Sequence, residues 1–462
     1  MWWSQYLLTV FSFLLAILLI FQMLRERRAP GSAMAWLLAM VLLPYVGVPL
    51  FLLLGGRKLR QVRENKGELY KPLPADESAT SLPTLERLLR RRGLPDRTDD
   101  NEVVVLHTGE SAYAALCEAL EGATRRIHIT TFILTLDSVG KSILEILEKK
   151  ARQGVEVRLL LDGLGSFWTF RWRFNSLKRA GGEVAFFLPI FHIPFSGHTN
   201  LRNHRKHITV DSQIAILGGT NIATEYLGPT PSPTRWVDLS VRLRGSAVAD
   251  VEALFVADWC FASGKPAPHP LTALEPIPRP ARGGDQSVQV VASGPDVRSD
   301  SLYDTITSAV FEARSRIWIA TPYFIPDETL GKALELAALR GVEVRLVIPK
   351  RSNHFFADVA RRGYLSQLER AGGQISYHVP TMLHAKVLIV DDRYALVGSA
   401  NFDMRSLLLN FEACVLLSSP KSLNGVDAWY RKVLGACVSN LLPRGWRAEL
   451  IEGLGRIIGP FL

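Results

Sequence analysis

The chain has 462 residues, 48% of them hydrophobic, and a formal net charge of +10. This length excludes one ordinary domain, because a single hydrophobic core stops growing near ~250–300 residues. Its four cysteines are scattered without C-x-x-C spacing, which excludes a cysteine-rich zinc site and a disulfide framework. We therefore expect two folded units with an appendage.

Two apolar segments open the chain, at residues 2–24 and 33–54. Each is long enough to cross ~30 Å of hydrocarbon as a helix, and buried core helices rarely run so long uncharged. The first segment also lacks the basic start and the cleavage site of a signal peptide. We predict that residues 1–56 form an N-terminal membrane helical hairpin. Pro44, Gly47 and Pro49 leave open whether the second segment spans the bilayer or is kinked or re-entrant.

Basic residues flank these segments unequally. Three arginines lie between them, whereas five lysines and arginines follow the second at residues 57–66. The larger group predicts that the C-terminal body lies in the cytoplasm. It also suits anionic lipid headgroups better than nucleic acid, so we expect no nucleic-acid partner.

The sequence after the apolar segments contains an internal repeat. RIHITTFIL at residues 126–134 resembles RIWIATPYF at 316–324, and GVEVR and RAGG each occur once per half. Strands alternating with helices predict an α/β fold with a largely parallel sheet covered by helices. We predict a basic connector at residues 57–100, a first domain at 101–261, a Pro-rich linker at 262–285 and a second domain at 286–462.

The most informative motif occurs late in each half, as H-x-K-x-x-x-x-D followed by G-[GS]-x-N. The first copy contains His204, Lys206 and Asp211, and the second contains His384, Lys386 and Asp391. Residues i and i+2 of a strand share a face, so each His and Lys point together. A hairpin then returns small and amide residues that suit the oxygens of a bound phosphate: Gly219, Thr220, Asn221, Ser399 and Asn401.

The acidic residues near the motifs are expected to have two different roles. Asp211 and Asp391 lie at an odd offset from the histidines, so we expect them to fix the turn and support the site. Glu412 is the expected partner of the His384 ring, and Asp238 is its expected analogue for His204. A carboxylate on one ring nitrogen fixes the tautomer and makes the other nitrogen a better base or nucleophile.

The paired motifs resemble those of the phospholipase D superfamily, whose two HKD motifs meet across a pseudo-twofold interface in one active site. The apolar segments, the PYVGVPLFLLLGGRK run, NIATEYLG and SANFDMRSLLLNFE resemble the bacterial cardiolipin synthases within it. The likeness covers nearly the whole length. One departure is the basic triplet at residues 205–207, which predicts a first strand less buried than in relatives.

This resemblance implies a phosphatidyltransferase in the bacterial inner membrane, multi-pass, with phosphatidylglycerol as substrate and cardiolipin and glycerol as products. It implies that His204 is the nucleophile of a phosphohistidine intermediate and that His384 is the acid and base. Lys206 and Lys386, with Asn221 and Asn401, would stabilise charge on the phosphate. No metal and no cofactor are expected, and the sequence leaves a homodimer open.

Other activities remain open at this point. Water as acceptor would give a phospholipase D, and phosphatidylethanolamine as donor would give another phosphatidyl transfer. A membrane-bound nuclease or phosphodiesterase could use the same two histidines, although the apolar hairpin argues against it. A non-catalytic lipid scaffold would be expected to carry a damaged motif, and both motifs are intact.

Aromatic residues interleaved with arginines fill residues 165–177, and Trp168 and Trp172 are among them. Such residues can pack in a core. They can also form an interfacial surface, with rings at the acyl boundary and arginines on phosphates. The sequence leaves both interpretations open.

Overall fold

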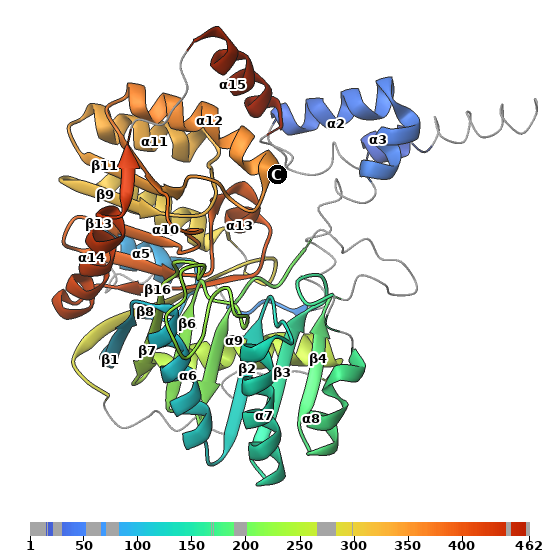
Figure 1. The fold of residues 1–462 in the computed structure, drawn as a ribbon. Coiled ribbons are helices and arrows are strands. Elements are labelled where there is room, and N and C mark those ends of the chain that lie inside the picture. Colours follow the sequence, from blue (N-terminus) through green and yellow to red (C-terminus); the bar gives the residue numbers. More distant parts are fainter. Residues whose placement is uncertain are drawn as a thin grey trace, which may run out of the picture.

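A computed structural model shows an α/β body in which two similar halves are stacked (Figure 1). The structure describes residues 15, 17–21, 30–51, 66–70, 83–167, 169, 171–188, 201–265, 283–297, 299–439 and 445–458. Most of the first apolar segment and most of the predicted Pro-rich linker lie outside these residues. So do Trp168 and much of the predicted connector.

The first half alternates strands and helices before ending in a long helix. Its elements are β1 (Thr98–Leu106), α6 (Gly109–Gly122), β2 (Arg126–Thr131), α7 (Ser138–Arg152), β3 (Glu156–Asp162), η3 (Arg171–Phe174), α8 (Asn175–Arg179), β4 (Glu183–Phe187), β5 (His207–Val210), β6 (Ile214–Gly218), β7 (Ser240–Arg244) and α9 (Ala247–Ser263). Polar side chains fix where helices begin. Thr108 and Ser111 form a capping box at α6, and Asp137 caps α7.

The second half repeats this order, which confirms the duplication. After α5 (Thr84–Arg91), which precedes both halves, its elements are β8 (Gln286–Ser293), α10 (Ser301–Glu312), β9 (Arg316–Ala320), β10 (Phe324–Ile325), α11 (Glu328–Leu339), β11 (Glu343–Pro349), α12 (Phe355–Arg370), β12 (Gln374–His378), β13 (Val387–Val390), β14 (Tyr394–Gly398), β15 (Phe402–Asp403), α13 (Met404–Leu408), β16 (Glu412–Leu417), α14 (Pro420–Leu434), β17 (Cys437–Ser439) and α15 (Trp446–Ile458).

One continuous sheet of 15 strands runs through both halves, in the order β17-β12-β11-β9-β13-β14-β16-β8-β1-β7-β6-β5-β2-β3-β4. Apart from the edge strand β17, the order reads as a mirror image about the junction of β8 and β1, which pair antiparallel. This arrangement agrees with the pseudo-twofold relation that the resemblance to the phospholipase D superfamily implies.

The prediction of a largely parallel sheet is wrong. In the first half only the β2–β3 and β3–β4 pairs are parallel, whereas β5, β6, β7 and β1 are joined by antiparallel pairs. The motif strand and its hairpin cause the difference, because a tight turn can join only antiparallel strands. The second half follows the same scheme.

Helices cover the sheet and close three main cores. Residues of α6 and α7 bury one face of the first half, and residues of α10 and α11 bury one face of the second. A third core contains residues of α9 and α14 together with strands of both halves. The two halves therefore share a hydrophobic interior across their junction.

The second apolar segment is broken. It forms α2 (Pro30–Leu42) and α3 (Pro44–Leu50), and Leu43 between them has non-helical dihedrals. A Cβ on Gly47 would lie 2.2 Å from the Ala39 carbonyl oxygen, so α3 turns back against α2 at a place where only glycine fits. This break agrees with the kinked and re-entrant alternatives and differs from one straight helix. Within the described ranges, no helix is both long and apolar enough to cross a membrane.

Candidate active site

The two His-x-Lys segments lie just before β5 and β13, so the prediction that each His and Lys belong to a strand is wrong. His207, the first residue of β5, pairs with Thr130 near the carboxyl end of β2. Val387 pairs in the same way with Ala320 at the end of β9. Each His and Lys therefore lies at the carboxyl edge of a central strand.

Each motif segment pairs with the other half of the molecule. Asn203 forms an isolated parallel bridge with Phe411, and the His204 amide donates to the Phe411 carbonyl at 2.9 Å. Leu383 forms the corresponding bridge with Val237, and the His384 amide donates to the Val237 carbonyl at 2.7 Å. Backbone hydrogen bonds thus bring both motifs to the junction of the halves.

The histidine partners are consequently crossed. His204 Nδ1 lies 2.9 Å from Glu412 Oε1, and His384 Nδ1 lies 2.8 Å from Asp238 Oδ2. The predicted pairing within each half is wrong, although both carboxylates belong to the site. Glu412 directly follows Phe411, and Asp238 directly follows Val237. The bridge that each of these neighbours forms therefore places the carboxylate beside the histidine of the other half.

Burial keeps both imidazoles neutral. It lowers the pKa of His204 to about 4, against the opposing charge of Glu412, and the pKa of His384 to about 3, where Lys386 adds to the effect. The carboxylate beside each Nδ1 favours the tautomer that is protonated on this nitrogen, and that tautomer has its lone pair on Nε2. The geometry supplies two oriented imidazoles, each able to act as base or nucleophile.

The two lysines lie beside the histidines. Lys206 Nζ donates to the His204 carbonyl at 2.8 Å. Lys386 Nζ lies 2.7 Å from His384 Nδ1 and 3.1 Å from His384 Nε2, which is the ring nitrogen able to accept a hydrogen bond when Nδ1 is protonated. Burial lowers the pKa of Lys206 to about 7 and that of Lys386 to about 8. A bound anion would favour the charged form of both.

One small residue after each hairpin contacts a carboxylate of the site, and the other residues have different partners. Ser399 Oγ donates to Glu412, and a Cβ on Gly219 would lie 2.2 Å from Asp238 Oδ1. Thr220 Oγ is 2.8 Å from Ser240 Oγ. Asn221 Oδ1 accepts from the Ile133 amide, and Asn401 Nδ2 donates to Ser406 Oγ. Direct phosphate contacts by these residues stay a prediction.

Asp211 and Asp391 hold turns, as expected. Both have positive φ, and the Asp391 carboxylate accepts from the amides of Arg314, Ser315 and Arg316 before β9. Asp211 accepts from the equivalent amides before β2. These bonds lower the pKa of both carboxyls, although burial opposes the shift.

The expectation that the basic triplet makes the first strand less buried is wrong. Arg205, Lys206 and His207 are all almost fully buried. Arg205 is neutralised there, because Nη1 lies 2.7 Å from Asp258 on α9 and Nη2 lies 3.0 Å from Asp296 after β8. A buried guanidinium is tolerated when carboxylates pair with it in this way.

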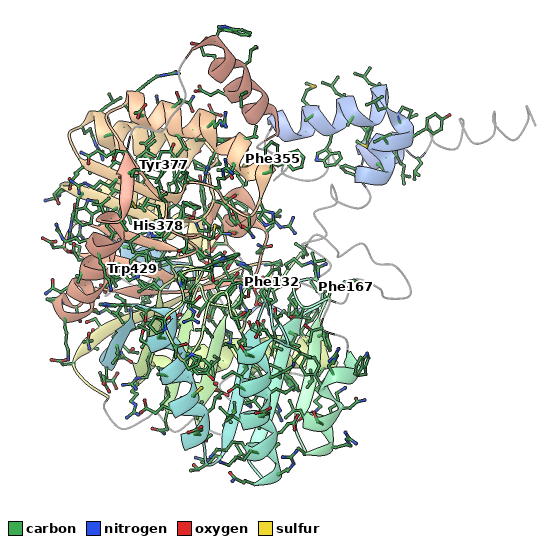
Figure 2. All side chains as sticks on the ribbon, in the orientation of Figure 1. Phe132, Phe167, Phe355, Tyr377, His378 and Trp429 are labelled. Carbon is green, nitrogen blue, oxygen red and sulfur yellow. The ribbon has the colours of Figure 1, made fainter. Side chains whose placement is uncertain are left out.

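Three aromatic residues that the sequence analysis did not single out contact the histidine rings. Phe132 meets His204 edge-on at 5.0 Å between centroids, and it lies between the two halves in Figure 2. Tyr226 and Trp236 lie 5.0 and 5.5 Å from His384. The sequence signal was their position, directly after β2 and between the first Gly-x-x-Asn and Asp238.

A family model described as the cardiolipin synthase, PLD-like domain matches residues 116–259 and 306–434. These ranges cover more than half of the chain and contain both motifs. The chain belongs to the phospholipase D-like cardiolipin synthase family. A second model, the phospholipase D-nuclease N-terminal segment, matches residues 14–56.

Relatives of this family match end to end. A cardiolipin synthase of Halalkalibacterium halodurans is 33% identical over 100% of this chain and 95% of its own. The major cardiolipin synthase of Bacillus subtilis is 34% identical, with 88% of each chain covered. The fold matches a solved phosphatidylserine synthase of Haemophilus influenzae with a TM-score of 0.60 and 15% identity, over 82% of this chain and 100% of that one.

The Asp391 turn gives a prediction on stability. Asp391→Ala removes several hydrogen bonds and places an alanine at φ 50°, so it should lower the free energy of unfolding by about 2–3 kcal/mol at neutral pH. Asp392→Ala, next to it and 91% exposed, should cost under about 0.5 kcal/mol. The pKa of the Asp391 carboxyl is lower in the folded than in the unfolded protein, so its stabilisation is lost once the carboxylate is protonated. The difference in unfolding free energy between the wild type and Asp391→Ala should therefore shrink as the pH falls below ~4. Denaturant unfolding measures both variants, and equal costs would contradict this account.

The crossed pairing gives a second prediction, which double-mutant cycles can test. Alanine substitutions of His204 with Glu412, and of His384 with Asp238, should show coupling energies of about 1–2 kcal/mol in unfolding. The uncrossed combinations, His204 with Asp238 and His384 with Glu412, should couple by less than about 0.5 kcal/mol. Stronger coupling within the uncrossed combinations would contradict the assignment.

Proposed function

We propose that this chain transfers a phosphatidyl group from one phosphatidylglycerol to another, forming cardiolipin and free glycerol. The family and the end-to-end relatives support the activity. The observation that carries the mechanism is the pair of crossed His–carboxylate contacts, which gives one site two oriented imidazoles.

The first half-reaction breaks the bond between phosphorus and the glycerol headgroup. His204 Nε2 attacks the phosphorus while Glu412 holds the Nδ1 proton, and a P–N bond forms. The departing alkoxide takes a proton from His384, whose imidazolium is stabilised by Asp238. The anionic substrate itself opposes the burial that lowers the pKa of His384.

The second half-reaction reverses the roles. His384, now neutral, removes the proton from a glycerol hydroxyl of a second phosphatidylglycerol. That oxygen attacks the phosphohistidine, and the P–N bond breaks to return neutral His204. Lys206 and Lys386 would neutralise the non-bridging oxygens in both steps, so this route uses no metal ion.

We place the reaction at the bacterial inner membrane. Residues 1–56 would anchor the chain as a hairpin, supported by the apolar sequence and by the match to the N-terminal family segment. The catalytic body would lie on the cytoplasmic side, following the excess of basic residues after the second segment.

The purified full-length enzyme with phosphatidylglycerol alone tests the function. Cardiolipin and glycerol should form in equal amounts, without a nucleotide-activated lipid and with a chelator present, as thin-layer analysis would show. Phosphatidic acid as the only product would instead make the protein a hydrolase. Complete loss of activity in chelator would contradict the metal-free route.

The two histidine variants should behave differently. His384→Ala keeps the nucleophile but loses the acid, so a p-nitrophenyl phosphodiester, whose leaving group needs no proton, should recover part of a ~10²–10⁴-fold defect. Radiolabel from this donor should accumulate on the protein in an acid-labile form. His204→Ala should show neither recovery nor label. The opposite pattern would reverse the roles, and no label in either variant would count against a phosphohistidine.

Exposed aromatic residues that follow equivalent strands of the two halves suggest how the body meets lipid. Phe174 is buried, whereas Trp172 after β3 is 61% exposed and Phe355 after β11 is 74% exposed. Strands β3 and β11 hold equivalent places in the two halves. Phe167, close to Trp172 in the chain, and Phe355 lie on the same flank of the molecule in Figure 2.

Replacing Trp172 and Phe355 by Ser should therefore slow turnover of bilayer phosphatidylglycerol about tenfold or more, because these rings would enter the acyl boundary. Turnover of a monomeric short-chain phosphatidylglycerol should change less than about twofold, since the site is intact. Leu339→Ser, 65% exposed on α11, is the control and should affect neither substrate. An equal loss on both substrates would show that these rings support the fold.

A further inference from the structure

A connector residue, Lys66, reaches into the interior of the body. Its side chain is 2% exposed, and Nζ lies 2.6 Å from Asp296 Oδ2 and contacts Asp258 Oδ1. The Leu69 amide, three residues on, donates to the Asp296 carbonyl at 2.8 Å. The sequence analysis placed Lys66 in a basic group that faces lipid headgroups. That prediction is wrong for Lys66, because its side chain is buried in the body.

Lys66 completes a four-charge cluster, formed by Lys66, Arg205, Asp258 and Asp296. Arg205 bonds both carboxylates, and all four side chains are at most 2% exposed. The two cations balance the two anions. Removing one cation would leave an uncompensated negative charge in the interior, which is costly.

The cluster contacts the chain on both sides of His204. Asn203 Nδ2 donates to Asp258 Oδ2 at 2.9 Å, and Arg205 Nε donates to the Glu412 carbonyl at 3.2 Å. Glu412 is the residue that holds the His204 ring. Among the residues that the structure describes, the second motif has no such arrangement, because Ala385 lies between His384 and Lys386 and is buried among apolar residues.

We propose that Lys66 is a positioning residue for His204, so that the connector must be docked for the first histidine to be correctly placed and uncharged. The match to the N-terminal family segment ends at residue 56. The short stretch from there to Lys66 reaches at most about 35 Å. Lys66 thus ties the membrane-proximal chain to the catalytic residue.

Lys66→Met in the full-length protein tests this. The ionisable groups nearest His204 are Glu412, Lys206 and Lys386, with the cluster behind them. Excess negative charge in the cluster favours the imidazolium, so the acid limb of the profile of kcat/KM against pH should move up by about one pH unit. The value of kcat/KM at neutral pH should fall about tenfold or more, mainly in kcat.

A second variant separates charge balance from loss of side-chain packing. Lys66→Met with Asp296→Asn restores one cation to one anion, so the acid limb and most of the activity should recover. Lys265→Met is the matched control, because this lysine also contacts a carboxylate, Glu183 at 2.7 Å, but is 54% exposed. It should leave the profile unchanged.

The readout is consumption of phosphatidylglycerol, which rests on the proposed chemistry at His204 but not on the identity of the acceptor. If the wild type releases phosphatidic acid, the proposed function fails and this comparison still stands. An unmoved acid limb in Lys66→Met, or no recovery in the double variant, contradicts the proposal. If Lys66→Met does not fold, the double variant decides: the wild-type profile supports the proposal, and inactivity contradicts it.

Discussion

The exchange of carboxylates between the halves is the constraint on which the site depends. Two short parallel bridges, Asn203 with Phe411 and Leu383 with Val237, carry Glu412 and Asp238 across the junction. A half on its own would hold a histidine without its orienting carboxylate. The duplicated chain thus makes one site in which each half completes the other, and the continuous sheet and the shared core of α9 and α14 fix the register at which they meet.

Burial sets the protonation states of the histidines and lysines of the site. It keeps both imidazoles neutral and lowers the pKa of both lysines, which prepares the site for an anionic diester. Hydrogen bonds from Ser399 and the close approach of Gly219 fit the two carboxylates into the space available. The charge cluster behind His204 is a strongly asymmetric feature of the described residues, and it distinguishes two histidines that occupy equivalent places in the repeat.

Much of the fold and of the candidate site could be predicted from the sequence. The repeats predicted the duplication, the motif spacing predicted the paired histidines and lysines, and the odd offset of Asp391 predicted its place in the turn. The pairing of Glu412 with His204 was not predictable, because it depends on which segments of different halves become neighbours. Arg205 was misjudged for the same reason: its partners Asp258 and Asp296 are far from it in the chain, and only the fold brings them together.

The most direct test of one composite site within one chain is to mix inactive variants. His204→Ala and His384→Ala chains, co-expressed in equal amounts, should give no more phosphatidyl transfer than either variant alone, because each chain builds its site from its own two halves. Recovery to about a quarter of the wild-type activity would contradict the account, since it would show that the two motifs of a working site come from different chains.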